Sequence, residues 1–281
     1  MPNTTRHPNG IPQSCYGVLQ QESGTSAGEE AVDHLQRLGY AIIDSSLSIT
    51  AIEHLGEEFN QARARYIGTY GEGKLKQLNE LHTIRALLTH GGSSFARLAL
   101  DPCLLGVLRK LIAGKFILNQ QNGVINPPGE SYNQGEWHRD LPYQHFVCSS
   151  PLAINALFCL DDFTLNNGAT FVLPGSHKTA SFPSWSYVQK NALQVQAKAG
   201  QFILLDCMVF HSGGFNRTTA ERRAINHVYN IPYFKQQINI PRNMVSHDLS
   251  TKEQELLGFG FSEPASVAEY LALRSDKLCH R

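Results

Sequence analysis

Two side chains that could bind a metal ion stand close together in the segment GEWHRDLPYQHF (residues 135–146). His138 and Asp140 are separated by one residue, so on an extended backbone the imidazole and the carboxylate point to the same side. Such a pair could hold a metal, or the two side chains could simply hydrogen-bond to each other. A third ligand elsewhere in the chain would favour the metal.

The segment DCMVFHSGGFN (residues 206–216) offers that third ligand. His211 ends an apolar strand pattern and precedes two glycines, which places it at the mouth of a strand. Two histidines and one carboxylate match the facial triad of non-haem Fe(II) oxygenases, in which other coordination positions stay open. Zinc accepts the same three ligands. A hydrolytic zinc site and a cupin-like barrel that binds metal without oxygen chemistry are therefore alternatives.

An arginine follows at the start of the next β-type segment, RRAINHVYN (residues 222–230). Arg222 could return beside His211 on a neighbouring strand and present its planar fork to a carboxylate. An iron oxygenase that uses a 2-oxoacid needs such a cation. Arg223 should face the opposite side of the strand, because adjacent strand residues alternate.

The elements that position these residues change in character along the chain. Helical periodicity predominates from about residue 28 to 112, with the short strand YAIIDS (residues 40–45) inside it. Short β-type segments separated by turn residues run from about 115 to 232. A helical tail follows from about 235 to 281, with a capping box at Ser250 and Glu253. This order predicts an α+β protein, with a helical layer packed against an all-β sandwich or barrel.

Composition limits the function classes. With 281 residues, 42% of them hydrophobic, the chain can bury one large core, which we assign to a single domain of residues 26–281 after a loose arm of residues 1–25. The 24 basic and 24 acidic residues balance, so we expect neither a nucleic acid nor a membrane as a partner. The six cysteines form no CxxC pair, and we expect them to be buried free thiols. The N-terminus resembles no signal peptide, and no apolar run approaches the about 20 residues of a membrane span. We therefore expect a cytoplasmic protein.

Three segments resemble the phytanoyl-CoA dioxygenase family of Fe(II)- and 2-oxoglutarate-dependent oxygenases. They are WHRDLPY (137–143), CLDDFTLNNGATFVLPGSHK (159–178) and AGQFILLDCMVFHSGGFNRTTAERRAINHVY (199–229). The resemblance covers about residues 30–232 and implies a double-stranded β-helix, a jelly-roll core, with helices on one face. It implies iron on His138, Asp140 and His211, 2-oxoglutarate held by Arg222, and O2 as second cosubstrate.

The resemblance implies hydroxylation of a small-molecule metabolite or natural-product intermediate, with release of succinate and CO2. Desaturation, cyclisation, epimerisation and endoperoxidation at the same iron site are alternatives. The implied contacts to 2-oxoglutarate are Asn155, Thr170 and Gln121, with Gln120 as a rival to Gln121 because the strand parity is unknown. The implied substrate contacts are Tyr143, His145 and Arg139, although Arg139 points opposite to its HxD neighbours and could instead face solvent or bind another part of the protein.

Three further residues near these motifs are expected to serve the fold. Trp137 is expected to pack, His177 to serve the PGSHK turn, and His227 to be a satisfied core histidine.

Overall fold

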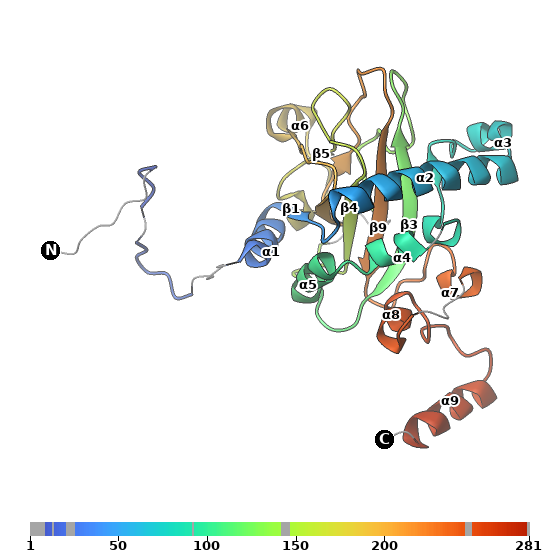
Figure 1. The fold of residues 1–281 in the computed structure, drawn as a ribbon. Coiled ribbons are helices and arrows are strands. Elements are labelled where there is room, and N and C mark those ends of the chain that lie inside the picture. Colours follow the sequence, from blue (N-terminus) through green and yellow to red (C-terminus); the bar gives the residue numbers. More distant parts are fainter. Residues whose placement is uncertain are drawn as a thin grey trace.

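The computed structural model describes residues 9–12, 14–20, 26–91, 93–141, 147–244 and 249–279. Tyr143 and His145, the two expected substrate contacts after the HxD motif, lie outside the described residues. The described part consists of a twisted β core with helices on one side (Figure 1).

The larger sheet has six antiparallel strands in the order β1–β7–β4–β9–β3–β2. These strands are β1 (Tyr40–Asp44), β2 (Thr83–Ile84), β3 (Ile117–Asn126), β4 (Ala153–Cys159), β7 (Gln201–Asp206) and β9 (Arg222–Asn230). Strands β3, β4, β7 and β9 are rich in Ile, Leu, Val and Phe and are mostly buried, as expected for strands covered on both faces.

The smaller sheet has the order β6–β5–β8, with β5 (Phe171–Val172), β6 (Leu193–Gln194) and β8 (His211–Ser212). A bridge between His138 and His211 adds the HxD segment beside β8. An apolar cluster that includes Phe163, Val172 and Ile203 fills the space between the two sheets. The two facing sheets form the expected double-stranded β-helix.

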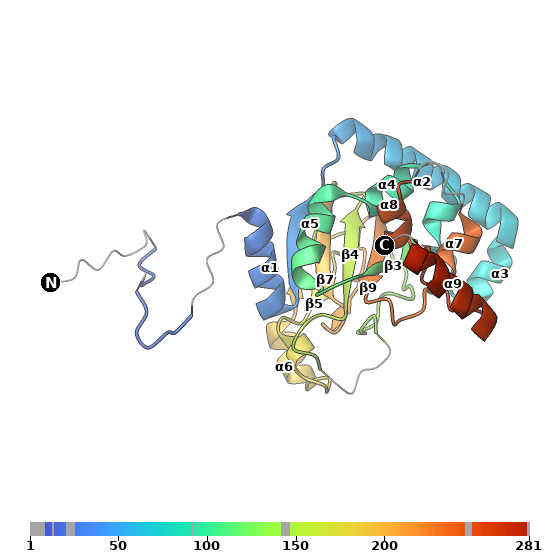
Figure 2. The same ribbon diagram turned by 90° about the horizontal axis from the view of Figure 1, so that it is seen from below.

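Helices cover the outer face of the larger sheet, as the second view shows (Figure 2). They are α1 (Ala27–Leu38), α2 (Ile49–Tyr70), α3 (Glu72–Gln77), α4 (Ser93–Ala99) and α5 (Pro102–Leu111), with a 3-10 turn η1 (Leu87–Thr89) between α3 and α4. Their apolar faces join the outward side chains of the sheet in one large core, in which Phe59 of α2 and Phe95 of α4 pack with Phe158, Phe202 and Tyr229. Burial of each such aromatic side chain contributes on the order of 2–3 kcal/mol.

Local signals in the sequence account for the bounds of α1. Ser26 and Glu29 form a capping box at its start, and Gly39 ends it in the left-handed region at φ 84°. The Gly39 N–H donates to Leu35 O at 2.7 Å. A Cβ at Gly39 would lie 2.7 Å from His177 Nδ1, so the position also requires the absence of a side chain.

The remaining helical elements lie between β5 and β6 and after β9. They are α6 (Trp185–Asn191), the 3-10 turn η2 (Ser176–Lys178), α7 (Ile240–Asn243), α8 (Thr251–Leu256) and α9 (Val267–Cys279). The capping box of Ser250 and Glu253 is present at the start of α8. No described helix is both long and apolar enough to cross a membrane.

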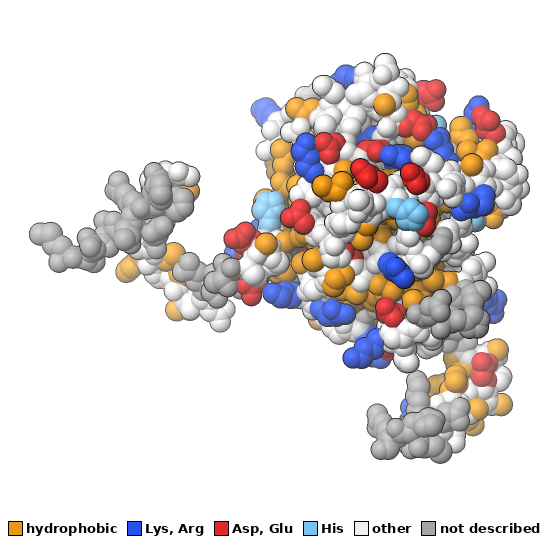
Figure 3. All heavy atoms as spheres, viewed as in Figure 1, with side chains coloured by type: hydrophobic (Ala, Val, Ile, Leu, Met, Phe, Trp, Pro, Cys, Tyr) orange, Lys and Arg blue, Asp and Glu red, His pale blue; other side chains and the backbone are white. Residues whose placement is uncertain are grey.

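Acidic and basic side chains are interspersed on the face shown in Figure 3, in keeping with the balanced charge of the sequence. The expectation of buried thiols is correct only in part. Cys159 and Cys207 are buried and Cys148 is half-buried, but Cys15 and Cys103 are exposed. Cys15 lies in the N-terminal arm, and Cys103 occupies an outward position in the first turn of α5.

Candidate metal centre and cosubstrate pocket

His138, Asp140 and His211 converge at one point between the two sheets. One ligand atom from each residue lies within 4.8 Å of the other two. His211 Nε2 is 3.8 Å from Asp140 Oδ1, and the two imidazole centroids are 4.3 Å apart. Two of the three side chains are half-buried and His211 is buried. The cluster has the ligand types and spacing of a metal site with open positions.

Backbone pairing brings the two ligand segments together. His138 N donates to His211 O at 3.0 Å, and His211 N donates to His138 O at 3.1 Å. Asp140 N donates to Cys207 O at 3.1 Å, which continues the contact along the HxD segment. Because side chains alternate along this extended segment, His138 and Asp140 both point into the barrel.

Hydrogen bonds orient both imidazoles. The Nδ1–H of His138 donates to Glu136 O at 2.7 Å, and the Nδ1–H of His211 donates to Val209 O at 3.1 Å. Both Nε2 atoms therefore keep their lone pairs for a metal. His138 Nε2 is buried, and no described residue hydrogen-bonds to it. Burial lowers the pKa of His211, which favours the neutral imidazole that a metal requires.

Asn155 on β4 supports the carboxylate ligand. Its Nδ2 donates to Asp140 Oδ2 at 2.9 Å, while the other oxygen of Asp140 faces His211. Asn155 was expected to contact 2-oxoglutarate. It does line the same cavity, but the contact that the structure gives it is to Asp140.

Arg222 begins β9 and points into the interior. It is only 3% exposed, and its Nη2 donates to the Tyr132 hydroxyl at 3.3 Å. Its guanidinium lies over the Phe163 ring at 3.8 Å. Its Nε and Nη1 are buried and have no hydrogen-bond acceptor among the described residues. Arginine stays charged in proteins, so a buried fork of this kind calls for an anionic partner.

Arg223 faces the opposite side of β9, as the alternation of strand residues predicts. Its guanidinium binds Asp161 at 2.7 Å and also donates to Gly56 O and Asn60. These contacts raise the pKa of Arg223, chiefly through the hydrogen bond to Asp161.

A narrow cavity of about 40 Å³ joins the histidines to Arg222. Thr170, an expected contact to 2-oxoglutarate, lines it. Its other lining residues are Val124, Tyr132, Gln134, His138, Asn155, Leu157, Leu205, His211, Gly213, Arg222, Ala224 and Asn226. Metal ligands and a buried cation thus face one space.

Gln121 lies on the wrong face of β3 for the role expected of it. It is fully buried, and its Nε2 donates to Phe95 O and to His227 Nε2 at 2.7 and 2.8 Å. The β3–β9 register pairs Gln121 with His227, and Gln121 bonds to Phe95 of α4, so Gln121 lies on the helical face of the sheet, a parity that the sequence did not reveal. The rival, Gln120, is on the cavity side, where its Nε2 donates at 3.1 Å to Asn226, a lining residue.

Arg139 is placed by the structure as a packing residue, which corrects its expected role as a substrate contact. It is 4% exposed and donates to the carbonyls of Ser176, Thr179 and Ala180. Trp137 packs with the apolar cluster of Leu173, Val188 and Phe210, as expected. Both side chains point away from the metal cluster because they alternate with its ligands.

The two further histidines have the expected structural roles. His177 is buried in the PGSHK turn and donates to Gln36 O at 3.1 Å. His227 donates through Nδ1 to Ala156 O at 3.0 Å and accepts from Gln121. Burial lowers the pKa of His227 to about 4.

Sequence reasoning missed Tyr132, Gly213 and Asn226. Asn226 follows Arg222 by four residues on β9, so its position on the cavity face could have been predicted from strand alternation. Tyr132 comes from a loop, NPPGESYNQGEW, for which no periodicity applies. A Cβ at Gly213 would lie 1.9 Å from the Tyr132 hydroxyl, so this glycine gives the phenol its room.

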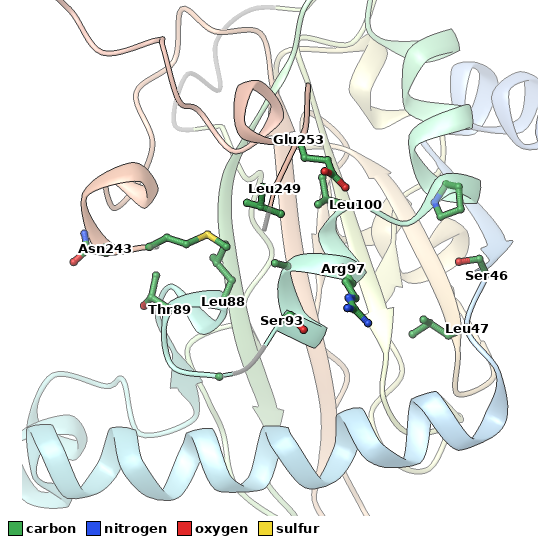
Figure 4. A pocket seen from close by; sticks show the side chains of 14 residues that line it. Ser46, Leu47, Leu88, Thr89, Ser93, Arg97, Leu100, Asn243, Leu249 and Glu253 are labelled. Atoms are coloured by element: carbon green, nitrogen blue, oxygen red, sulfur yellow. The ribbon is translucent and has the colours of Figure 1, made fainter. Parts of the chain in front are cut away.

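A larger hollow of about 760 Å³ lies elsewhere, on the helical side (Figure 4). Arg97 and Ser93 reach it from α4, and Leu249 and Glu253 reach it from the tail. It contains none of the metal cluster and no arrangement of groups suited to catalysis among its lining residues, so its size does not mark it as the active site.

Comparison with known proteins agrees with the class that the fold and site define. The sequence pattern of the family "Phytanoyl-CoA dioxygenase (PhyH)" matches residues 35–224. The chain therefore belongs to the phytanoyl-CoA dioxygenase family and is a dioxygenase of the 2-oxoglutarate-dependent class.

Individual relatives extend beyond the family region. The uncharacterized protein Rv1501 of Mycobacterium tuberculosis is 30% identical over 261 residues, which cover 90% of this chain and 94% of that protein. The ectoine dioxygenase of Stutzerimonas stutzeri is 25% identical over 232 residues, covering 72% and 76% of the two chains. The crystal structure of EctD from S. alaskensis with 2-oxoglutarate and 5-hydroxyectoine shares the fold, with a TM-score of 0.62, 23% identity, and coverage of 77% of this chain and 81% of that one.

Proposed function

We propose that the chain uses Fe(II) and 2-oxoglutarate to hydroxylate a small-molecule metabolite or natural-product intermediate. His138, Asp140 and His211 would hold the iron, and Arg222 would bind the distal carboxylate of 2-oxoglutarate. One observation carries the proposal: the buried Arg222 guanidinium, with two nitrogens that have no acceptor among the described residues, shares a cavity with His138 and His211.

The carboxylate subsite is built from three side chains. Arg222 offers two parallel N–H groups, which match a carboxylate in a bidentate pair. Tyr132 lies 3.3 Å from Arg222 Nη2, and burial raises the pKa of Tyr132, so its hydroxyl stays protonated and can donate. Thr170 lines the same space and adds a hydroxyl. Two described carboxylates lie near the start of β9, but Asp161 bonds to Arg223 and Glu221 bonds to Arg63, which leaves the Arg222 fork for a ligand.

Residues of this chain also prepare the metal side. Asn155 holds one oxygen of Asp140 and directs the other toward the histidines. The carbonyls of Glu136 and Val209 fix both imidazole tautomers. Val124, Leu157, Leu205 and Ala224 give the cavity apolar walls that exclude water from the reacting centre. Iron held there would activate O2 with 2-oxoglutarate as the co-reductant, so that one oxygen atom enters the substrate hydroxyl, the other enters succinate, and CO2 is released.

The lining groups favour a small polar substrate. Gln134 and Asn226 present carboxamides to the cavity, and Asn226 is held by Gln120. The relative named ectoine dioxygenase and the EctD structure with 5-hydroxyectoine support a compact polar molecule of that size class.

The test is a screen of small polar metabolites for succinate formation that requires added Fe(II). The His211→Ala variant serves as the control, since it removes one ligand from a strand end. Product mass separates the outcomes, because hydroxylation adds an oxygen atom whereas desaturation removes a pair of hydrogens. Iron-independent turnover, or equal turnover by His211→Ala, would overturn the proposal.

A further inference from the structure

The turn PGSHK (residues 174–178) takes no part in the proposed chemistry, yet it contacts both segments that carry the metal ligands. It includes η2 (Ser176–Lys178) and follows β5. One contact reaches Arg139, between His138 and Asp140, and another reaches Phe210, immediately before His211.

The first contact runs through the Arg139 guanidinium. Nη2 donates to Ser176 O at 2.8 Å and also to Thr179 O, and Nη1 donates to Ala180 O at 3.0 Å. The face of the same guanidinium lies 3.9 Å from the centroid of the Phe210 ring. Arg139 therefore connects the HxD segment to the turn and, through stacking, to the segment that ends in His211.

The second contact runs through the Ser176 side chain. Phe210 N donates to Ser176 Oγ at 2.9 Å, and Phe210 O accepts from Leu173 N at 2.9 Å. Ser176 thus accepts one hydrogen bond from each ligand segment, through its carbonyl from Arg139 and through its hydroxyl from Phe210.

The turn itself is anchored to α1. Gly175 N donates to Leu38 O at 2.8 Å, and His177 donates to Gln36 O at 3.1 Å. Gly175 has φ 76°, a conformation that favours glycine, and it directs Ser176 back toward the barrel. The turn can therefore act as a fixed reference for the two segments that it binds.

We propose that Ser176 and Arg139 are positioning residues that set the spacing between the His138–Asp140 pair and His211. The direct link between the two segments consists of the His138–His211 bridge and of the hydrogen bonds from Asp140 N to Cys207 O and from Gly213 N to Gln134 O. The second link through Ser176 holds the segments from their outer side. Metal affinity then depends on residues whose side chains never touch the metal. The inference rests on the proposed function only for the identity of the metal ligands.

The test measures Mn²⁺ binding to the metal-free full-length protein by calorimetry. Ser176→Ala removes the acceptor for Phe210 N, and Arg139→Met removes the guanidinium. Each should weaken Mn²⁺ binding by about 10- to 100-fold, the usual effect of losing a supporting contact behind a metal ligand. Arg139→Lys should recover only part of the affinity, since an ammonium group cannot bridge several carbonyls and lie flat on Phe210 at the same time.

Arg223→Lys is the matched control. Arg223 is also a partly buried arginine with several acceptors, but it binds Asp161 and Asn60 on the outer face of β9. A general loss of stability would lower the thermal unfolding midpoint of Arg139→Lys and Arg223→Lys alike. The inference predicts that Mn²⁺ affinity falls only in the former.

The outcomes separate this inference from the proposed function. If the wild-type protein binds no Mn²⁺, the metal site itself is wrong. If the wild type binds Mn²⁺, and folded Ser176→Ala and Arg139→Lys bind it equally well, the positioning role is wrong. Should Arg139→Met fail to fold, these two milder variants still decide the matter.

Discussion

Arg222 and Arg223 are neighbours in β9, and their guanidinium groups serve opposite faces of the same sheet. Arg222 is buried in the barrel beside Tyr132, and Arg223 is bound to Asp161 beneath α2. The two residues have the same chemistry and differ only in strand parity. They therefore form an internal pair of test and control positions for cosubstrate binding.

Arg222→Ala should raise the 2-oxoglutarate concentration needed for half-maximal succinate formation by about 30-fold or more. Loss of one partner of a buried charge pair costs about 2–5 kcal/mol, and each 1.4 kcal/mol is tenfold. Arg222→Lys should restore only part, because lysine lacks the planar fork. Arg223→Ala should change the titration little. A large effect of Arg223→Ala with none of Arg222→Ala would reverse the assignment.

Tyr132→Phe should weaken 2-oxoglutarate binding by roughly tenfold, because it removes a hydroxyl that can donate to an ionised group, a hydrogen bond of about 1.5–3 kcal/mol. Gly213→Ala should have a similar effect, since its Cβ would occupy the place of the phenol oxygen. Tyr187→Phe, on the exposed surface of α6, is the control. The measurement is the same titration, and an unchanged value for Tyr132→Phe would remove Tyr132 from the subsite.

Asn155→Ala should lower metal affinity by about 10- to 100-fold, because Asp140 loses the donor that orients it. The comparison is Asn191→Ala, at an exposed position whose amide donates to Tyr187 O within α6. Calorimetry with Mn²⁺ gives the affinity directly. Wild-type affinity in Asn155→Ala would show that Asp140 needs no such support.

His227 should make folding stability depend on pH. Its pKa in the folded protein is about 4, lowered mainly by burial, although hydrogen bonds to Ala156 and Ile225 and the charge of Asp101 oppose the shift. An imidazole in the unfolded chain titrates near 6.5. The unfolded state therefore gains a proton that the folded state cannot hold. The contribution is full above about pH 6.5 and falls by about 1.4 kcal/mol per pH unit toward pH 4.

The measurement for His227 is urea unfolding between pH 7 and pH 5. His227→Asn keeps an amide donor for Ala156 O but does not titrate. As the pH is lowered, the unfolding free energy of this variant should therefore decrease less steeply than that of the wild type. Equal slopes for the wild type and His227→Asn would contradict the burial argument.

Much of the fold could be predicted because local signals agreed with it. The glycine at 39 and the capping boxes at Ser26 and Ser250 mark helix ends through backbone chemistry that acts over a few residues. The change from helical to alternating periodicity near residue 115 marked the start of the β core, at β3. The order HxD, then histidine, then arginine predicted which side chains meet.

The misplaced residues depended on features that local patterns do not contain. Gln121 was expected from the resemblance, with Gln120 as its rival, because the sequence does not show which face of β3 each residue occupies; the pairing of β3 with β9 decides it. Arg139 proved to be buried because three carbonyls of a turn about forty residues away accept its N–H groups. Tyr132 reaches the site from an aperiodic loop, and its place depends on Gly213, which directly follows β8.

The most direct test of the account is calorimetric binding of 2-oxoglutarate to the metal-free and Mn²⁺-loaded protein, with no substrate present. The account predicts that 2-oxoglutarate binds to the Mn²⁺-loaded wild type and to Mn²⁺-loaded Arg223→Ala with the same affinity. The affinity for 2-oxoglutarate should fall by at least about tenfold in three cases: the metal-free wild type, His211→Ala and Arg222→Ala. Equal binding with and without metal, or wild-type affinity in both His211→Ala and Arg222→Ala, would contradict a shared metal and cosubstrate pocket.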